Sequence, residues 1–159
     1  MINFNNIFDI SYKEQSQEQQ DIFSIEEQVN NGWKYVKPLK DPKSIDKFES
    51  KHGIKFPKDL KEIFLKYNGG RPPKRYFDVG KEKDIEFKTL LSFNKDDPEN
   101  IYTSLDTSDN KLIPFASTPG GDFICLKSNK IYFWIQDTDK SVLIASTFTE
   151  FLKMLNDGE

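Results

Sequence analysis

The chain has 159 residues and a formal net charge of −3; 36% of its residues are hydrophobic and 14% are aromatic. No apolar run approaches the roughly 20 residues that a membrane-spanning helix needs, and a single cysteine excludes an internal disulfide. The 14 phenylalanines supply a core, since each aromatic ring can bury about 150–250 Å². We therefore expect one domain over residues 1–159, located in the cytoplasm.

The charges are unevenly distributed along the chain. Residues 1–31 carry a net charge of −5, residues 32–88 of +7 and residues 89–159 of −5. Because proteins that bind nucleic acid are usually basic overall, this balance disfavours a nucleic-acid partner. Two interpretations stay open: the fold has a basic and an acidic face, or the charges only solvate its helices.

The N-terminal part is the least regular in pattern. Residues 1–14 alternate Asn with Ile and Phe, which is typical of a short strand or a docked arm, and residues 11–21 are polar and Gln-rich. Neither a basic region nor a long apolar segment begins the chain, so we predict no signal peptide. Residues 22–31 have weak helical spacing, and residues 33–36 are expected to be extended.

Two helices joined by a short link carry the strongest local signals. Asp41 and Pro42 predict the start of the first helix, and Gly53 in a left-handed conformation ends it. The second helix begins at Pro57 and ends at Asn68-Gly69-Gly70. Its apolar stripe has helical spacing and consists of Leu60, Ile63, Phe64 and Tyr67.

A mainly antiparallel sheet is predicted for the rest of the chain. A strand at 76–79 and one within 84–93 precede a short helix over 98–106. Short turns then join three strands, which must be antiparallel neighbours, at 111–116, 122–127 and 130–135. A fourth strand at 142–145 leads into a last helix, where Thr147 and Glu150 have the spacing of a capping box. The expected fold class is α+β, with helices packed around this meander.

Catalytic and cofactor motifs are weak in this sequence. The turn 118–122 contains two glycines but precedes a strand and lacks a Gly-Lys-Ser/Thr, so it is interpreted as a hairpin rather than a phosphate loop. Cys125 alternates with apolar neighbours and is expected to be buried, and His52 is the only histidine. A Cys/His zinc site within one chain and a Ser-His-Asp triad are therefore not expected, and no catalytic residue, metal or cofactor is assigned.

Aromatic side chains gather on the predicted meander. Stacking on single-stranded nucleic acid would require more neighbouring basic residues than this part of the chain has. We therefore expect the aromatic set to pack in the core against the helices. It consists of Phe115, Phe123, Tyr132, Phe133 and Trp134.

Acidic side chains form the candidate partner-binding surface. One group falls in a predicted loop-rich segment without a base: Asp96, Asp97, Glu99, Asp106 and Asp109. A second group falls at strand ends: Asp122, Asp137 and Asp139. The spacing does not match a calcium loop, and turn chemistry or solvation remains the plain alternative for both groups. As a surface, they would receive a basic protein.

An ordered series of segments resembles the SMI1/KNR4 (SUKH) superfamily over about residues 40–155. The first are residues 45–57, which end in His-Gly-Ile-Lys-Phe-Pro, and residues 60–70, which end in Tyr-Asn-Gly-Gly. The later ones are Ile113-Pro-Phe-Ala116, Gly121-Asp-Phe-Ile-Cys-Leu126, Ile131-Tyr-Phe-Trp134 and residues 144–152. The chain departs from the pattern at Lys127, where an acid often follows.

The resemblance implies an α+β fold and a non-enzymatic, protein-binding role. Many bacterial members resemble immunity proteins that bind and neutralise a toxin, often a nuclease, of polymorphic or contact-dependent systems. We therefore expect a basic toxin as the protein partner, no nucleic-acid or membrane partner, and a monomer or weak homodimer. A scaffold or regulatory protein in cell-wall assembly or stress signalling is the alternative.

Overall fold

The computed structural model describes residues 32–105 and 111–158. The predictions for residues 1–31 and for Asp106 and Asp109 therefore fall outside the described residues. The helices are α2 (Ser44–His52), α3 (Lys58–Tyr67), α4 (Ile101–Ser104) and α5 (Phe148–Met154). The strands are β1 (Tyr76–Val79), β2 (Glu82–Glu86), β3 (Thr89–Leu90), β4 (Ile113–Ser117), β5 (Phe123–Lys127), β6 (Lys130–Ile135) and β7 (Lys140–Ala145).

The predicted meander forms the main sheet. Its order is β3-β4-β5-β6-β7, and every pair of neighbouring strands is antiparallel. Short turns set the order from β4 to β7, because a strand that reverses within a few residues pairs with the strand before it. In the central pair, Phe123 lies opposite Trp134 and Cys125 opposite Tyr132. The α+β class and the antiparallel meander are confirmed.

The segment 84–93, in which the sequence predicts one strand, contains the end of β2 and all of β3, because the chain changes its partner strand there. Up to Phe87 it pairs with β1, and the Phe87 amide donates to the Arg75 carbonyl oxygen at 2.6 Å. From Lys88 onward it pairs with β4, and the Lys88 amide donates to the Ser117 carbonyl oxygen at 2.8 Å. β2 thus belongs to a two-stranded hairpin with β1, and β3 forms the edge of the main sheet.

Two predicted helix starts are also displaced. α2 begins at Ser44 rather than at Pro42, because the Asp41 carboxylate accepts from the Lys43 amide and closes a turn first. α4 begins at Ile101 rather than at 98, because Asn100 is its N-cap and the Asn100 side chain accepts from the Thr103 amide. The left-handed Gly53, with φ of 63°, ends α2 as predicted.

Helix α5 begins with the predicted capping box. Thr147 Oγ1 accepts from the Glu150 amide at 3.0 Å. Glu150 Oε1 accepts at 3.1 Å from the amide of Ser146, which is the residue before the N-cap Thr147. These two bonds fix where the chain turns from β7 into α5.

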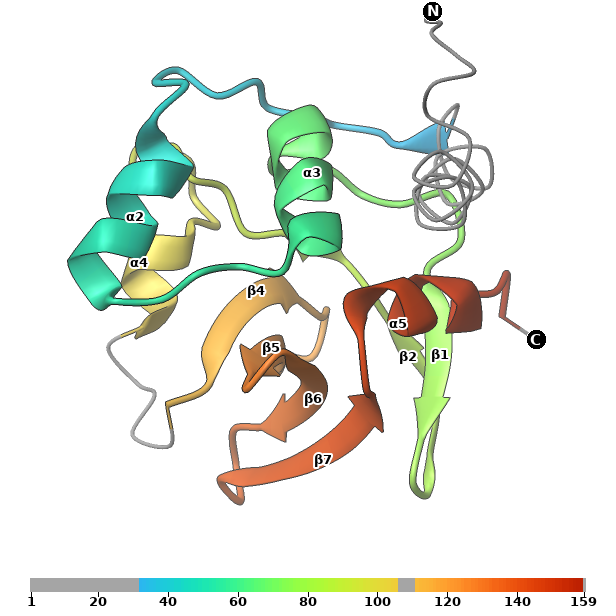
Figure 1. Ribbon diagram of the computed structural model, residues 1–159. Helices are drawn as coiled ribbons and strands as arrows, with labels where there is room; N and C mark the ends of the chain where they lie inside the picture. The colour runs from blue at the N-terminus through green and yellow to red at the C-terminus, as the bar shows by residue number, and fades with distance from the viewer. Residues whose placement is uncertain (1–31, 106–110, 159) are drawn as a thin grey trace, which may run out of the picture.

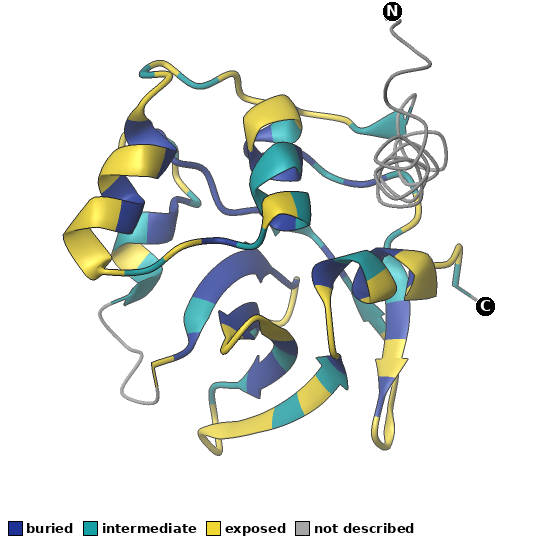
Figure 2. Cartoon of the chain, viewed as in Figure 1, coloured by how far each residue is buried: buried dark blue, intermediate teal, exposed yellow. Residues whose placement is uncertain are grey.

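Helices α2, α3 and α5 lie on the same side of the main sheet, and their inward faces are buried (Figures 1 and 2). Phenylalanines fill the space between these layers. The Phe64 and Phe93 ring centroids lie 4.9 Å apart, and those of Phe115 and Phe148 lie 5.8 Å apart. Of the predicted stripe on α3, Leu60, Ile63 and Phe64 are buried, while Tyr67 stacks on Trp33 at 4.7 Å.

The predicted aromatic set divides between the two faces of the sheet. Phe115 and Phe133 lie in the core beneath the helices. Tyr132 and Trp134 belong instead to a separate cluster with Leu112 and Cys125. The expectation that all five aromatics pack against the helices is wrong, since successive side chains of a strand point to opposite faces. Phe123 packs against both clusters.

Candidate protein-binding surface

The first predicted acidic group, here the acidic loop, consists of Asp96, Asp97 and Glu99, which lie between β3 and α4. The Asp96 carboxylate pairs with the Lys40 ammonium. The hydrogen bond from Lys40 is the main reason that the pKa of Asp96 is lowered. Glu99 Oε2 lies 3.0 Å from Lys88 Nζ. Two of the three carboxylates thus already have a basic partner within the chain.

Asp97 has a structural role in the same loop. Its Oδ2 accepts from Ser92 Oγ at 2.6 Å and from Asn94 Nδ2 at 3.2 Å. Ser92 Oγ in turn accepts from Asn68 Nδ2 at 3.0 Å, and Asn68 Oδ1 accepts from the Phe93 amide at 2.9 Å. This network connects the loop to the C-terminal end of α3, so the Asp97 carboxylate stabilises the fold through its hydrogen bonds.

The second predicted group, here the acidic hairpins, consists of Asp122, Asp137 and Asp139. Asp122 Oδ1 accepts from the Gln136 amide at 2.8 Å, which joins the turn after β4 to the turn after β6. Asp139 Oδ1 accepts from the Trp134 indole Nε1 at 2.8 Å. Asp137 is exposed. The fold therefore brings two turns that are distant in sequence to one end of the sheet.

The turn between β4 and β5 has the structure of a hairpin. The Gly121 amide donates to the Thr118 carbonyl oxygen at 3.2 Å, and Gly121 has a φ of 89°. A left-handed conformation of this kind favours glycine. Thr118 Oγ1 also accepts from the Asp122 amide at 3.2 Å, which holds the start of the turn against its end. The amides of Thr118, Gly121 and Asp122 thus donate to acceptors within the hairpin itself.

Cys125 and His52 are the two residues whose side chains were considered for catalysis or metal binding. Cys125 is buried, and burial raises the pKa of its thiol, which keeps it protonated and unreactive. His52 is exposed at the end of α2, with its ring 4.4 Å from that of Phe48. Within 32–105 and 111–158, no three His, Cys, Asp or Glu side chains are grouped so that they could hold a metal ion.

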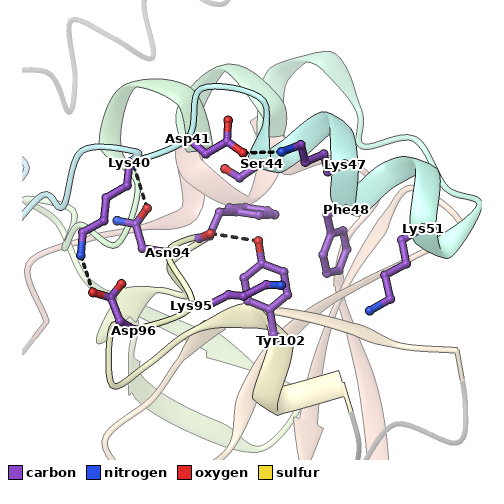
Figure 3. A pocket seen from close by; sticks show the side chains of 11 residues that line it. Lys40, Asp41, Ser44, Lys47, Phe48, Lys51, Asn94, Lys95, Asp96 and Tyr102 are labelled. Carbon is purple, nitrogen blue, oxygen red and sulfur yellow. Dashed lines mark hydrogen bonds and ion pairs between the residues drawn. The ribbon is translucent and has the colours of Figure 1, made fainter.

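A cleft that the sequence predictions missed lies between α2 and the segment 93–102 (Figure 3). Its volume is about 280 Å³, and lysines form much of its rim. Two features of the sequence are consistent with its basic rim: the positive net charge of residues 32–88, and the i, i+4 spacing of Lys47 and Lys51 on α2. The position of the loop opposite could not be inferred from spacing alone.

These features define a small α+β domain with a five-stranded antiparallel meander, helices on one face and charged turns at one end of the sheet. Its helix pair and meander follow the order of one known family. The chain belongs to the SMI1/KNR4 family (SUKH-1), whose family model matches residues 41–154. Searches of curated proteins and of solved structures found no match. Among the described residues, no helix has the length and apolar character needed to cross a membrane.

Proposed function

We propose that this protein is an immunity protein, which binds and neutralises a cognate toxin through the acidic hairpins. The observation that carries the proposal is the meeting of Asp122, Asp137 and Asp139 at one end of the sheet. Membership of the SMI1/KNR4 family supports a role in binding proteins. A basic nuclease is the toxin class that this surface fits, because its own substrate is an anion and its active site is therefore positively charged.

The geometry of the acidic hairpins favours binding over mere solvation. Asp122 and Asp139 are each held by a hydrogen bond to one carboxylate oxygen, so binding would cost little additional side-chain entropy. Asp137 extends the same surface with an exposed carboxylate. Opposite charges on the toxin would raise the rate of encounter and select the correct partner.

The acidic loop is the weaker candidate for the contact. Lys40 and Lys88 pair with Asp96 and Glu99, which cancels most of the local field. Reversal of Asp97 would break its bonds with Ser92 and Asn94, so such a variant would lose stability as well as charge. A useful charge reversal must therefore leave Asp97 in place.

Protection in cells tests the proposal. The protein is co-expressed with the toxin domain encoded beside its gene, and survival is compared with cells that carry the toxin domain alone. We expect protection by the wild-type protein and weaker protection by Asp137→Lys, because a repulsive charge replaces an attractive one. The control is Glu62→Lys on α3, which makes the same charge change on the helix layer.

Two results would contradict the proposal. If no toxin is encoded nearby, or if the wild-type protein fails to protect, the immunity role is lost. If Asp137→Lys and Glu62→Lys both protect fully while the wild-type protein also does, the role stands but the contact lies outside the acidic hairpins.

A further inference from the structure

The cleft between α2 and the segment 93–102 has an apolar floor that is fixed in place. Phe48 and Tyr102 form part of this floor, and their ring centroids lie 5.9 Å apart. The Tyr102 hydroxyl donates to the Phe93 carbonyl oxygen at 2.9 Å, so the tyrosine ring cannot swing out without losing this bond. Figure 3 shows both rings facing the opening between helix and loop.

The rim of the cleft carries an excess of positive charge. Four lysines and two aspartates line it, which leaves two positive charges uncompensated. Lys40 pairs with Asp96, and Lys47 Nζ lies 2.7 Å from Asp41 Oδ2. The excess therefore belongs to Lys51 and Lys95.

One of the two excess ammonium groups lies against the apolar floor, and the other belongs to the rim. Lys95 Nζ lies 5.3 Å from the centre of the Tyr102 ring. In Figure 3, the Lys95 side chain crosses this ring, whereas the Lys51 side chain extends from α2 to one side of it. The cleft thus combines positive charge with an aromatic wall.

Ser44 supplies an independent sign of a ligand. It is the first residue of α2 and is only 7% exposed, yet its Oγ has no hydrogen-bond partner among the residues that the structure describes. Ser44 lines the cleft, and Figure 3 shows its hydroxyl directed toward the end formed by Lys40 and Asn94. A buried hydroxyl without a partner is costly, and an oxygen acceptor in the cleft would remove that cost.

We propose that this cleft binds a small organic anion, a phosphate or carboxylate carried on an apolar body. The apolar body would lie against Phe48 and Tyr102, and an anionic oxygen would accept from Ser44 Oγ under the field of the rim lysines. Anions are also favoured at the N-terminal end of a helix, where Ser44 lies. The volume of about 280 Å³ is near the lower end of ligand pockets, which restricts the body to about one ring. This site is separate from the acidic hairpins.

Titration of the full chain with phenyl phosphate, followed by amide chemical shifts, tests the proposal. We expect saturable shifts at millimolar ligand, centred on Ser44, Phe48 and Tyr102. Inorganic phosphate lacks the apolar body and phenol lacks the charge, so both should bind more weakly. Shifts that never saturate, or that scatter over surface lysines for phenyl phosphate and inorganic phosphate alike, would overturn the proposal.

Variants separate ligand binding from folding. Ser44→Ala should leave thermal stability unchanged or higher, because it removes an unpartnered hydroxyl, while affinity for phenyl phosphate falls about tenfold. The double variant Lys51→Ala and Lys95→Ala should lower affinity by a similar factor. The control is Lys127→Ala, an exposed lysine on β5, which should change nothing. If the Ser44 and lysine variants bind as tightly as the control, the site is wrong.

Discussion

Single polar side chains hold the loop opposite α2 in place. Asn68 connects the end of α3 to this loop, since its Nδ2 donates to the Lys37 carbonyl oxygen at 2.7 Å and to Ser92 Oγ at 3.0 Å. Its Oδ1 accepts from the Phe93 amide at 2.9 Å. The residue is 1% exposed, so water cannot replace these bonds. At the residue scale, this one amide positions the wall of the cleft.

Replacing Asn68 by alanine should therefore be costly. The Phe93 amide and the Lys37 carbonyl oxygen would both lose their partner, and we expect the free energy of unfolding to fall by about 2–4 kcal/mol. Urea denaturation measures this loss. A loss below about 1 kcal/mol would show that the network does not hold the loop.

The buried thiol of Cys125 makes a pH-dependent prediction. Burial raises its pKa in the fold, so the contribution of the protonated thiol is complete below the pKa of the unfolded thiol, about 8.5, and is lost as pH rises through the higher folded value. Wild type should therefore lose more stability than Cys125→Ala above about pH 8.5, which denaturation at several pH values measures. A thiol reagent should modify Cys125 only on unfolding. Rapid modification of the native protein would contradict its burial.

Individual elements show what sequence pattern can predict. The stripe on α3, the capping box of α5 and the order of the meander follow from spacing that each segment carries by itself. The division of residues 84–93 into two strands cannot be predicted in this way. It depends on the strands with which Phe87 and Lys88 pair, and the local sequence pattern does not change between these two residues. The predicted start of α2 is wrong for a local reason: an Asp-Pro pair can begin a turn as well as a helix.

Helix α3 offers a matched pair of substitutions. Phe64 is fully buried among Phe56, Phe93 and Phe115, whereas the next residue, Leu65, is 50% exposed. Phe64→Ala should lower the free energy of unfolding by about 3–5 kcal/mol, because it leaves a cavity in the core. Leu65→Ala should change it by at most about 1 kcal/mol in chemical denaturation. Equal losses in the two variants would contradict the inward face assigned to α3.

The whole molecule separates two charged sites onto different parts of the fold. The acidic hairpins belong to the turns of the main sheet, and the lysine-rimmed cleft belongs to α2 and its facing loop. The sequence showed the acids of both predicted groups but could not show which were paired. Lys40 and Asp96 are distant in the chain, and their pairing depends on the tertiary fold. The alternation of charge along the chain left two interpretations open, a fold with faces of opposite sign and charges that only solvate its helices.

The association rate with the cognate toxin domain tests the central claim most directly. We expect the rate constant of the wild-type protein to fall as salt is raised, because salt screens the attraction. At low salt, Asp137→Lys should associate roughly threefold more slowly than wild type, while Glu62→Lys should match it. If Asp137→Lys associates as fast as wild type at every salt concentration, the acidic hairpins are not the surface that meets the toxin.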